Sequence, residues 1–213
     1  MTETKDGTVL MTIKAPGEQP FGLTYDGESL WVSDRKDRKI YRINPESGQV
    51  LFSIAFDGDL TGTAWDGKHV WQADQGSRTI SCINPETGAI ELAIKVDMPN
   101  GDVTGLYYEA DGEKGPGLWY ALSRLGQARK VKADDGSFLK AIPTVKDICG
   151  LVPLGKHLFF TEPGAGLMHK MHMASGSLLM SYKIGGRPSG LAHDGEAFWV
   201  ADLDSAEIRR FTL

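Results

Sequence analysis

Three aspartates recur at one position of an internal repeat, each standing three residues before a glycine. They are Asp59, Asp102 and Asp147, and the other two copies hold Gln19 and Arg187 at this position. If neighbouring copies bring them together, two carboxylates about 4 Å apart repel by roughly 4 kcal/mol at an effective dielectric constant near 20. Such a cluster would bind a cation, hold a proton at a raised pKa, or be offset by Arg187.

The residue types around these aspartates favour a hard cation. Thr61 and Thr104 follow Asp59 and Asp102 by two residues, and carboxylate and hydroxyl oxygens suit Ca²⁺ or Mg²⁺ better than zinc. The alternative is that each aspartate caps its own loop by accepting backbone N–H hydrogen bonds. Both interpretations remain open from the sequence: a metal or proton-transfer site built on Asp59, Asp102 and Asp147, or three separate loop caps.

A second ring is expected directly before the glycines, because residues two apart in an extended segment point the same way. Its members are Phe21, Thr61, Thr104, Cys149 and Ser189. We expect Asp102, Asp147 and Cys149 to be the candidate catalytic groups. A nucleophilic Cys149 would need a cation that lowers its pKa, and Arg187 is the cation that the sequence offers nearby. The expected substrate-binding residues are Gln19, Phe21, Thr61, Thr104, Arg187 and Ser189.

The remaining soft ligands favour structural roles. Cys82 and Cys149 are too few and too far apart to predict a disulfide framework or a zinc site. His169, Met171 and Met173 share one face of an expected strand and could hold Cu(I), but methionine is a common core residue and a core role is favoured. Cys82 is expected in the core as well.

The repeat itself predicts the fold. Five copies open with glycines spaced 40, 43, 45 and 40 residues apart, and 45 residues separate the last glycine from the first across the chain ends. Each copy has the signals of four strands, with Asp-Gly turns typical of hairpins. The sequence therefore predicts an all-β, closed five-bladed β-propeller. The opening glycines are Gly22, Gly62, Gly105, Gly150 and Gly190.

Two further features recur in the copies and are expected to be structural. A large aromatic residue lies in every second strand and is predicted to pack between neighbouring blades. An acid ends the second strand in four copies and is predicted to cap a turn. The aromatic residues are Trp31, Trp71, Trp119, Phe159 and Trp199, and the acids are Asp34, Asp74, Glu162 and Asp202.

The chain ends are expected to share a sheet. The last copy stops at Leu213 after three strands, and residues 7–15 resemble the outer strand of the copy before it. Pairing this N-terminal strand with the last blade closes the ring and removes exposed edges. The few residues before Gly7 are expected to be loose. The predicted blades of this single domain span 19–57, 58–99, 100–145, 146–185, and 186–213 with 7–15.

Composition excludes several partner classes. The 213 residues carry a net charge of −5, with 41 % hydrophobic and 24 % charged residues. This acidic balance argues against nucleic acid and anionic membranes as partners, and no apolar run approaches the ~20 residues that cross a bilayer. No signal peptide is visible. We expect a cytoplasmic monomer whose partner is a small-molecule substrate or a peptide.

The repeat resembles that of the streptogramin lyase (virginiamycin B lyase) family and, more loosely, the NHL and SMP-30/gluconolactonase propellers. The resemblance lies in Pro20-Phe21-Gly22-Leu23, Leu30-Trp31-Val32 and Pro188-Ser189-Gly190-Leu191. It implies a propeller lyase with a Mg²⁺ site and a histidine–glutamate set in the two rings described above. This chain has no histidine in either ring, and the glutamate-bearing inner motif of plant-type glutaminyl cyclases is not found.

The leading functional hypothesis is a metal-assisted lyase or hydrolase that acts on a small molecule at the axial loop face. In it, Asp59, Asp102 and Asp147 hold the cation or act as base, and Arg187 orients an anionic group of the substrate. The alternative is a non-catalytic propeller that binds a peptide or partner protein on the same face.

Overall fold

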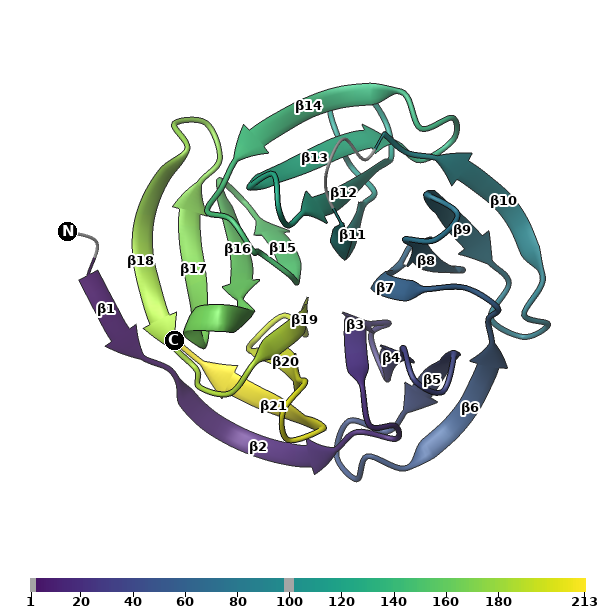
Figure 1. Cartoon of the computed structure of the whole chain (residues 1–213), viewed down its shortest axis with the longest axis horizontal. Coiled ribbons are helices and arrows are strands. Elements are labelled where there is room, and N and C mark those ends of the chain that lie inside the picture. Colours follow the sequence, from purple (N-terminus) through teal and green to yellow (C-terminus); the bar gives the residue numbers. More distant parts are fainter. Residues whose placement is uncertain (1–2, 98–101) are drawn as a thin grey trace.

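The computed structural model describes residues 3–97 and 102–213, and it forms a closed ring of five antiparallel sheets around a central axis (Figure 1). The protein is a five-bladed β-propeller, as the repeat predicts. Each blade runs from an inner strand near the axis to an outer strand at the rim. In the described residues no helix is long and apolar enough to cross a membrane.

The first three blades each contain four consecutive strands. The first blade consists of β3 (Pro20–Tyr25), β4 (Leu30–Asp34), β5 (Lys39–Ile43) and β6 (Val50–Ala55). The second consists of β7 (Leu60–Trp65), β8 (Val70–Asp74), β9 (Thr79–Ile83) and β10 (Ile90–Lys95). The third consists of β11 (Val103–Glu109), β12 (Gly117–Leu122), β13 (Gln127–Lys132) and β14 (Phe138–Pro143).

The last two blades also take strands from the N-terminus. The fourth consists of β15 (Leu151–Leu154), β16 (His157–Glu162), β17 (Leu167–His172) and β18 (Ser177–Lys183), with a short 3₁₀ turn, η1 (Pro163–Ala165), between β16 and β17. The fifth consists of β19 (Pro188–His193), β20 (Phe198–Asp202), β21 (Glu207–Thr212) and the N-terminal β2 (Thr8–Lys14).

The predicted closure of the ring is confirmed. Strand β2 pairs antiparallel with β21 as the outermost strand of the fifth blade, and Ile13 lies opposite Ile208. Both of these side chains are buried. The two ends of the chain are therefore joined by a hydrogen-bonded sheet with apolar packing, and no terminal blade is left open (Figure 1).

The expectation that the residues before Gly7 are loose is wrong for Glu3–Asp6. These residues form strand β1, which pairs in parallel with β18 and adds a fifth strand to the fourth blade. The backbone N–H of Gly7 then donates to the carbonyl of Lys183 at 2.9 Å. The N-terminal segment thus spans two blades, with β1 on the fourth and β2 on the fifth.

The hydrophobic core lies between the blades. Five separate clusters of buried side chains each join two neighbouring blades, and each contains one of the recurring second-strand aromatics. Trp31 stacks on Trp65 of the next blade at 6.0 Å between ring centroids, and Trp71 stacks on Tyr108 at 6.1 Å. The predicted packing role of these aromatics is therefore confirmed.

Candidate functional site

The ring directly before the opening glycines is buried and holds neighbouring blades together. The Thr104 hydroxyl donates to the carbonyl of Ile148 in the next blade at 2.8 Å, and the Ser189 hydroxyl donates to that of Pro20 at 2.9 Å. Thr61 donates within its own blade, to Ala73. The sequence analysis predicts that these hydroxyls bind a substrate, but in the structure they donate to backbone carbonyls. All five members, Phe21, Thr61, Thr104, Cys149 and Ser189, are buried.

The opening glycines close the axis beneath this ring. The inner strands approach so closely that a Cβ on Gly105 would overlap the carbonyl oxygen of Cys149. The room left for water among these strands is about 0 Å³, so the inner strands leave no space for a water molecule. The mouth above the glycines therefore does not continue as a channel through the propeller.

The second ring, three residues before the glycines, lies at the surface of this mouth. Asp59 is half-buried and pairs with Arg35 of the preceding blade, with Oδ1 2.6 Å from a guanidinium nitrogen. Asp102 accepts a hydrogen bond from Gln75 at 2.7 Å and pairs with Arg124 at 3.1 Å. Each of these two carboxylates therefore has its own donors, which lie on loops that follow the second strands.

The other three members of this ring are exposed. Asp147 has a backbone φ of 59°, which is rare for residues other than glycine. Its backbone N–H donates to the carbonyl of Ser123 at 2.9 Å. Arg187, expected to orient a substrate anion, instead pairs with Asp204 at 3.0 Å. The backbone N–H of Gln19 donates to Asp34.

The three aspartates do not form one cation-binding set. A group of metal-ligating side chains whose ligand atoms all lie within 4.8 Å of one another occurs once in the described residues, and Asp59, Asp102 and Asp147 are not in it. The physical reason is that local partners hold two of the carboxylates apart, Arg35 at Asp59 and Arg124 at Asp102. The arrangement does not fit a shared Mg²⁺ or Ca²⁺ ion, which takes six or more oxygen ligands.

Cys149 is a poor nucleophile in this structure. Burial raises the pKa of its thiol to about 12, and the opposing effects of the Gly150 N–H, Arg35 and Thr104 are smaller. The side chain is 2 % exposed. A thiol of this kind stays protonated at neutral pH, whereas nucleophilic cysteines have lowered pKa values and partial exposure. Burial therefore argues against a catalytic role for Cys149.

Arg35 is the side chain of the mouth that sequence reasoning missed. Its guanidinium carbon lies 4.9 Å from the centroid of the Phe21 ring, and the side chain is 33 % exposed. It follows Asp34 at the end of β4, where the second and fifth blades have Gln75 and Leu203. The sequence shows that Arg35 differs from its counterparts, but it does not show the contacts with Phe21 and Asp59.

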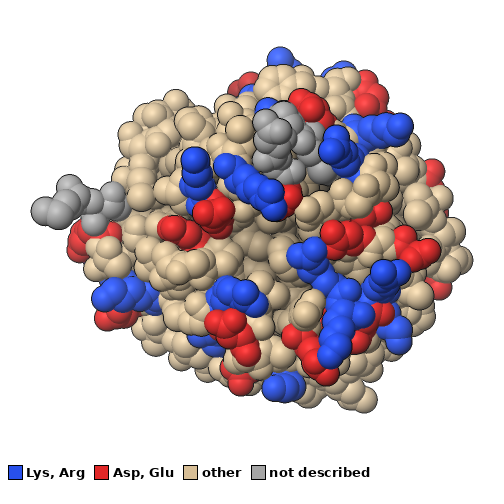
Figure 2. Space-filling model, viewed as in Figure 1, with Lys and Arg blue, Asp and Glu red and all other residues tan. Residues whose placement is uncertain are grey.

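The loop face carries charged side chains of both signs. Figure 2 shows Lys and Arg side chains interspersed with Asp and Glu around a central hollow. The outer acids help to build this face, because Asp34 accepts the backbone N–H groups of Gln19, Lys36 and Asp37. Asp74 and Asp202 accept equivalent N–H groups in their blades. These three acids cap turns, as predicted.

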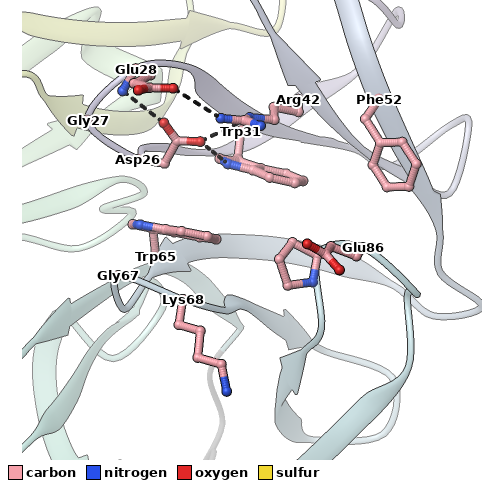
Figure 3. A pocket seen from close by; sticks show the side chains of 11 residues that line it. Asp26, Gly27, Glu28, Trp31, Arg42, Phe52, Trp65, Gly67, Lys68 and Glu86 are labelled. Carbon is pink, nitrogen blue, oxygen red and sulfur yellow. Dashed lines mark hydrogen bonds and ion pairs between the residues drawn. The ribbon is translucent and has the colours of Figure 1, made fainter.

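A cleft of about 880 Å³ opens between the first two blades on the opposite face. Figure 3 shows Trp31 and Trp65 facing one another, with Arg42 and Asp26 beside Trp31. The Trp31 indole donates to Asp26 at 2.8 Å, and Arg42 pairs with the same carboxylate. Trp199, Asp194 and Arg210 make the same contacts in the fifth blade. We therefore interpret the Trp31, Asp26 and Arg42 side of the cleft as a repeated structural feature of the blades.

The histidine- and methionine-containing strand β17 belongs to the core. His169 is buried and uses both ring nitrogens, Nδ1 with Ser181 at 2.9 Å and Nε2 with Glu162 at 2.8 Å. Met171 is also buried. The core interpretation of this strand is thus favoured over a Cu(I) site.

The group with metal-ligating geometry is Asp66, His69 and Cys82 in the second blade. Asp66 and His69 lie on the turn between β7 and β8, and Cys82 lies in β9. Burial, with smaller effects from Asp66 and Glu91, raises the pKa of Cys82 to about 11. The sequence analysis placed Cys82 in the core, where it is buried, but did not identify this group.

Comparison with known proteins supports the architecture. The sequence matches no protein-family model and no curated protein. The structure is similar to that of glutaminyl cyclase from Myxococcus xanthus, with a TM-score of 0.81 and 13 % identity. The match covers 100 % of this chain and 98 % of that one. At this identity the likeness establishes the fold, a five-bladed propeller.

Streptogramin-degrading lyases are more distant structural neighbours. A catalytically inactive virginiamycin B lyase from Staphylococcus aureus with quinupristin matches with a TM-score of 0.56 and 20 % identity, over 93 % of this chain and 67 % of that one. A streptogramin B lyase matches with a TM-score of 0.56 and 18 % identity, over 96 % and 68 %. The resemblance noted in the sequence thus extends to the propeller fold and not to a specific family.

Proposed function

We propose that this protein is an enzyme of lyase, hydrolase or cyclotransferase type that acts on a small molecule with an anionic group, bound in the axial mouth of the loop face. The observation that carries the proposal is the position of Arg35, partly exposed above Phe21 and held by Asp59. The opening glycines close the axis below and form the floor of the mouth.

Arg35 is suited to bind a carboxylate of the substrate. A planar guanidinium binds carboxylates through two parallel hydrogen bonds, and stacking on an aromatic ring restricts its orientation. Asp59 occupies one side of the group, and the side chain is still 33 % exposed. This role replaces the one expected for Arg187, which is engaged by Asp204.

Asp147 is the candidate general base. Its carboxylate is exposed, and its backbone is held in the left-handed region, where strained residues often serve function. Asp102 is firmly held by Gln75 and Arg124 and is better suited to position a neighbouring group. The proposal includes no divalent cation at the mouth, because the three aspartates do not form a ligand set.

The structural neighbours support an enzymatic propeller over a binding module. The match with a glutaminyl cyclase covers nearly the whole of both chains, and two streptogramin lyases share the propeller fold. A dipeptide with an N-terminal glutamine and a free C-terminal carboxylate is therefore the first probe. In its cyclisation the α-amine attacks the side-chain amide carbon, ammonia leaves, and a pyroglutamyl ring forms.

The test compares glutaminyl-phenylalanine with its C-terminal amide, which lacks the carboxylate. We expect ammonia release from the acid to exceed that from the amide, and Arg35→Met to lower kcat/KM for the acid by about 10–100-fold, the value of a charged hydrogen bond. Asp147→Asn should lower kcat. Arg38→Met is the matched control, since Arg38 forms an exposed ion pair with Asp57.

Two results would contradict this proposal. One is that the Arg35→Met and Arg38→Met variants convert the acid at the same rate. The other is the absence of both conversion and thermal protection with either peptide, which would remove the mouth as a site for this substrate class.

A further inference from the structure

A basic side chain faces the second-strand aromatic in four of the five blades. In the first, third and fifth blades it pairs with a carboxylate at the end of the first strand or in its turn. The same carboxylate accepts the indole N–H of the aromatic residue. The facing pairs are Trp31 with Arg42, Trp119 with Lys130, Phe159 with Lys170, and Trp199 with Arg210.

The second blade keeps the carboxylate and the tryptophan but not the cation. The Trp71 indole donates to Asp66 at 2.8 Å, as in the other blades. The residue opposite Trp71 is Cys82. His69 stands three residues after the turn aspartate, where the first and fifth blades have Ser29 and Ala197. The second blade thus has two metal-ligating side chains, and it lacks the basic side chain that the first and fifth blades have opposite the tryptophan.

The ligand atoms of this group are close enough to share one ion. Those of Asp66, His69 and Cys82 all lie within 4.8 Å of one another. His69 Nδ1 lies 3.1 Å from Asp66 Oδ2, and two ligands at about 2.0–2.1 Å from a tetrahedral zinc ion lie about 3.3 Å apart. A thiolate, an imidazole and a carboxylate together are a ligand set suited to zinc.

The surroundings of the group are acidic and incompletely paired. Glu91 Oε2 lies 3.2 Å from His69 Nε2 but out of line for a hydrogen bond, so this buried nitrogen has no hydrogen-bond partner in the described structure. No lysine or arginine of the described residues pairs with Asp66 or Glu91 within 4.0 Å, whereas Asp26 has Arg42 and Asp194 has Arg210.

We propose that Asp66, His69 and Cys82 bind a Zn²⁺ ion, which supplies the positive charge that a basic side chain supplies in other blades. His69 binds through Nδ1 and turns its Nε2–H toward Glu91, and the Trp71 indole hydrogen-bonds the ligating carboxylate. Such outer contacts are usual around zinc ligands. The fourth position stays open to water. The site lies on the face opposite the axial mouth and is independent of the proposed enzymatic function.

Metal binding to the full-length protein tests this proposal directly. The protein is stripped with EDTA and titrated with ZnCl₂ against a chromophoric chelator of micromolar affinity. We expect one equivalent of zinc to bind and the melting temperature to rise, because a ligand of the folded state stabilises it. Cys82→Ser and His69→Ala should each abolish this shift, while the matched controls Cys149→Ser and His172→Ala should retain it.

Cobalt substitution provides a readout that does not depend on the variants folding. Co²⁺ added to the stripped wild type should give a thiolate-to-metal absorption band that excess Zn²⁺ removes. The proposal is overturned if the wild type binds no zinc, if the cobalt complex lacks the thiolate band, or if Cys82→Ser and His69→Ala bind zinc as the wild type does.

Discussion

Cys82 lies directly opposite Trp71 across strands β8 and β9, at the register position where Arg42 lies opposite Trp31. The double variant Cys82→Arg/His69→Ser therefore rebuilds the ion pair of the first blade around Asp66. We expect it to fold, to lose zinc binding, and to melt at or slightly above the temperature of zinc-free wild type. The gain is small because partly exposed ion pairs contribute about 0–1 kcal/mol.

Calorimetry of both proteins in EDTA, together with the zinc titration, checks this expectation. A double variant that melts well below the zinc-free wild type would show that the arginine does not take the place of the two ligands.

The blades were predictable from sequence because their signals lie in side chains that repeat. Trp31 and its four counterparts mark the second strands, and the likeness of residues 7–15 to the outer strand of the fourth copy marks the strand that closes the ring. Strand β1 has no such signal. Glu3–Asp6 is polar and exposed, and it joins β18 through backbone pairing at a free sheet edge, which needs no particular side chains.

Truncation from the N-terminus separates the roles of the two strands. Deletion of residues 1–6 removes β1 and should leave one cooperative unfolding transition with a modest loss of stability, because β2 still closes the ring. Deletion of residues 1–14 also removes Ile13 and the outer strand of the fifth blade. We expect that protein to lose cooperative unfolding or to aggregate.

Chemical denaturation followed by tryptophan fluorescence measures both deletions. Equal losses would mean that removing β2 adds nothing to the loss caused by removing β1, and no loss for the longer deletion would mean that the ring does not depend on the shared sheet.

The candidate site was less predictable because its contacts cross blades. Spacing placed Thr104 and Ser189 toward the mouth, but their hydroxyls bond to the backbone of the next blade. The side chain that reaches the mouth, Arg35, belongs to a different loop from its partner Asp59. Similarly, Cys82 meets His69 only because the turn before β8 folds back beside β9. A repeat alignment identifies unusual residues but not their partners.

Gly105→Ala should destabilise the propeller by about 1–3 kcal/mol or more, the usual cost of adding volume to a tightly packed interior. The added methyl group would overlap the Cys149 carbonyl, which is backbone and cannot move aside as a side chain does. Urea denaturation measures the loss. Gly164→Ala is the control, since a Cβ there contacts nothing within 4 Å, and similar losses for both variants would contradict the proposed crowding at the axis.

Acid sensitivity should come partly from Asp194. Burial alone would raise its pKa, but hydrogen bonds from Arg210, from the backbone N–H groups of Ala197 and Glu196, and from Trp199 together lower it below the ordinary value of 3.8. A carboxylate with a lowered folded-state pKa stabilises the fold fully above its unfolded-state pKa and loses this contribution as the pH falls through the folded-state pKa. Stability should therefore decrease as the pH falls below about 4.

Comparison with Asp194→Asn isolates this contribution. The variant should be less stable than the wild type at pH 7, and the difference in the free energy of unfolding should narrow as the pH falls below 3.8, because the wild-type carboxylate becomes protonated and loses its charged contact with Arg210. Asp57→Asn, at a side chain that is 98 % exposed, should differ little from the wild type at any pH. Urea denaturation at a series of pH values measures these differences, and a constant gap between wild type and Asp194→Asn down to acid unfolding would show that Asp194 does not make the fold acid-sensitive.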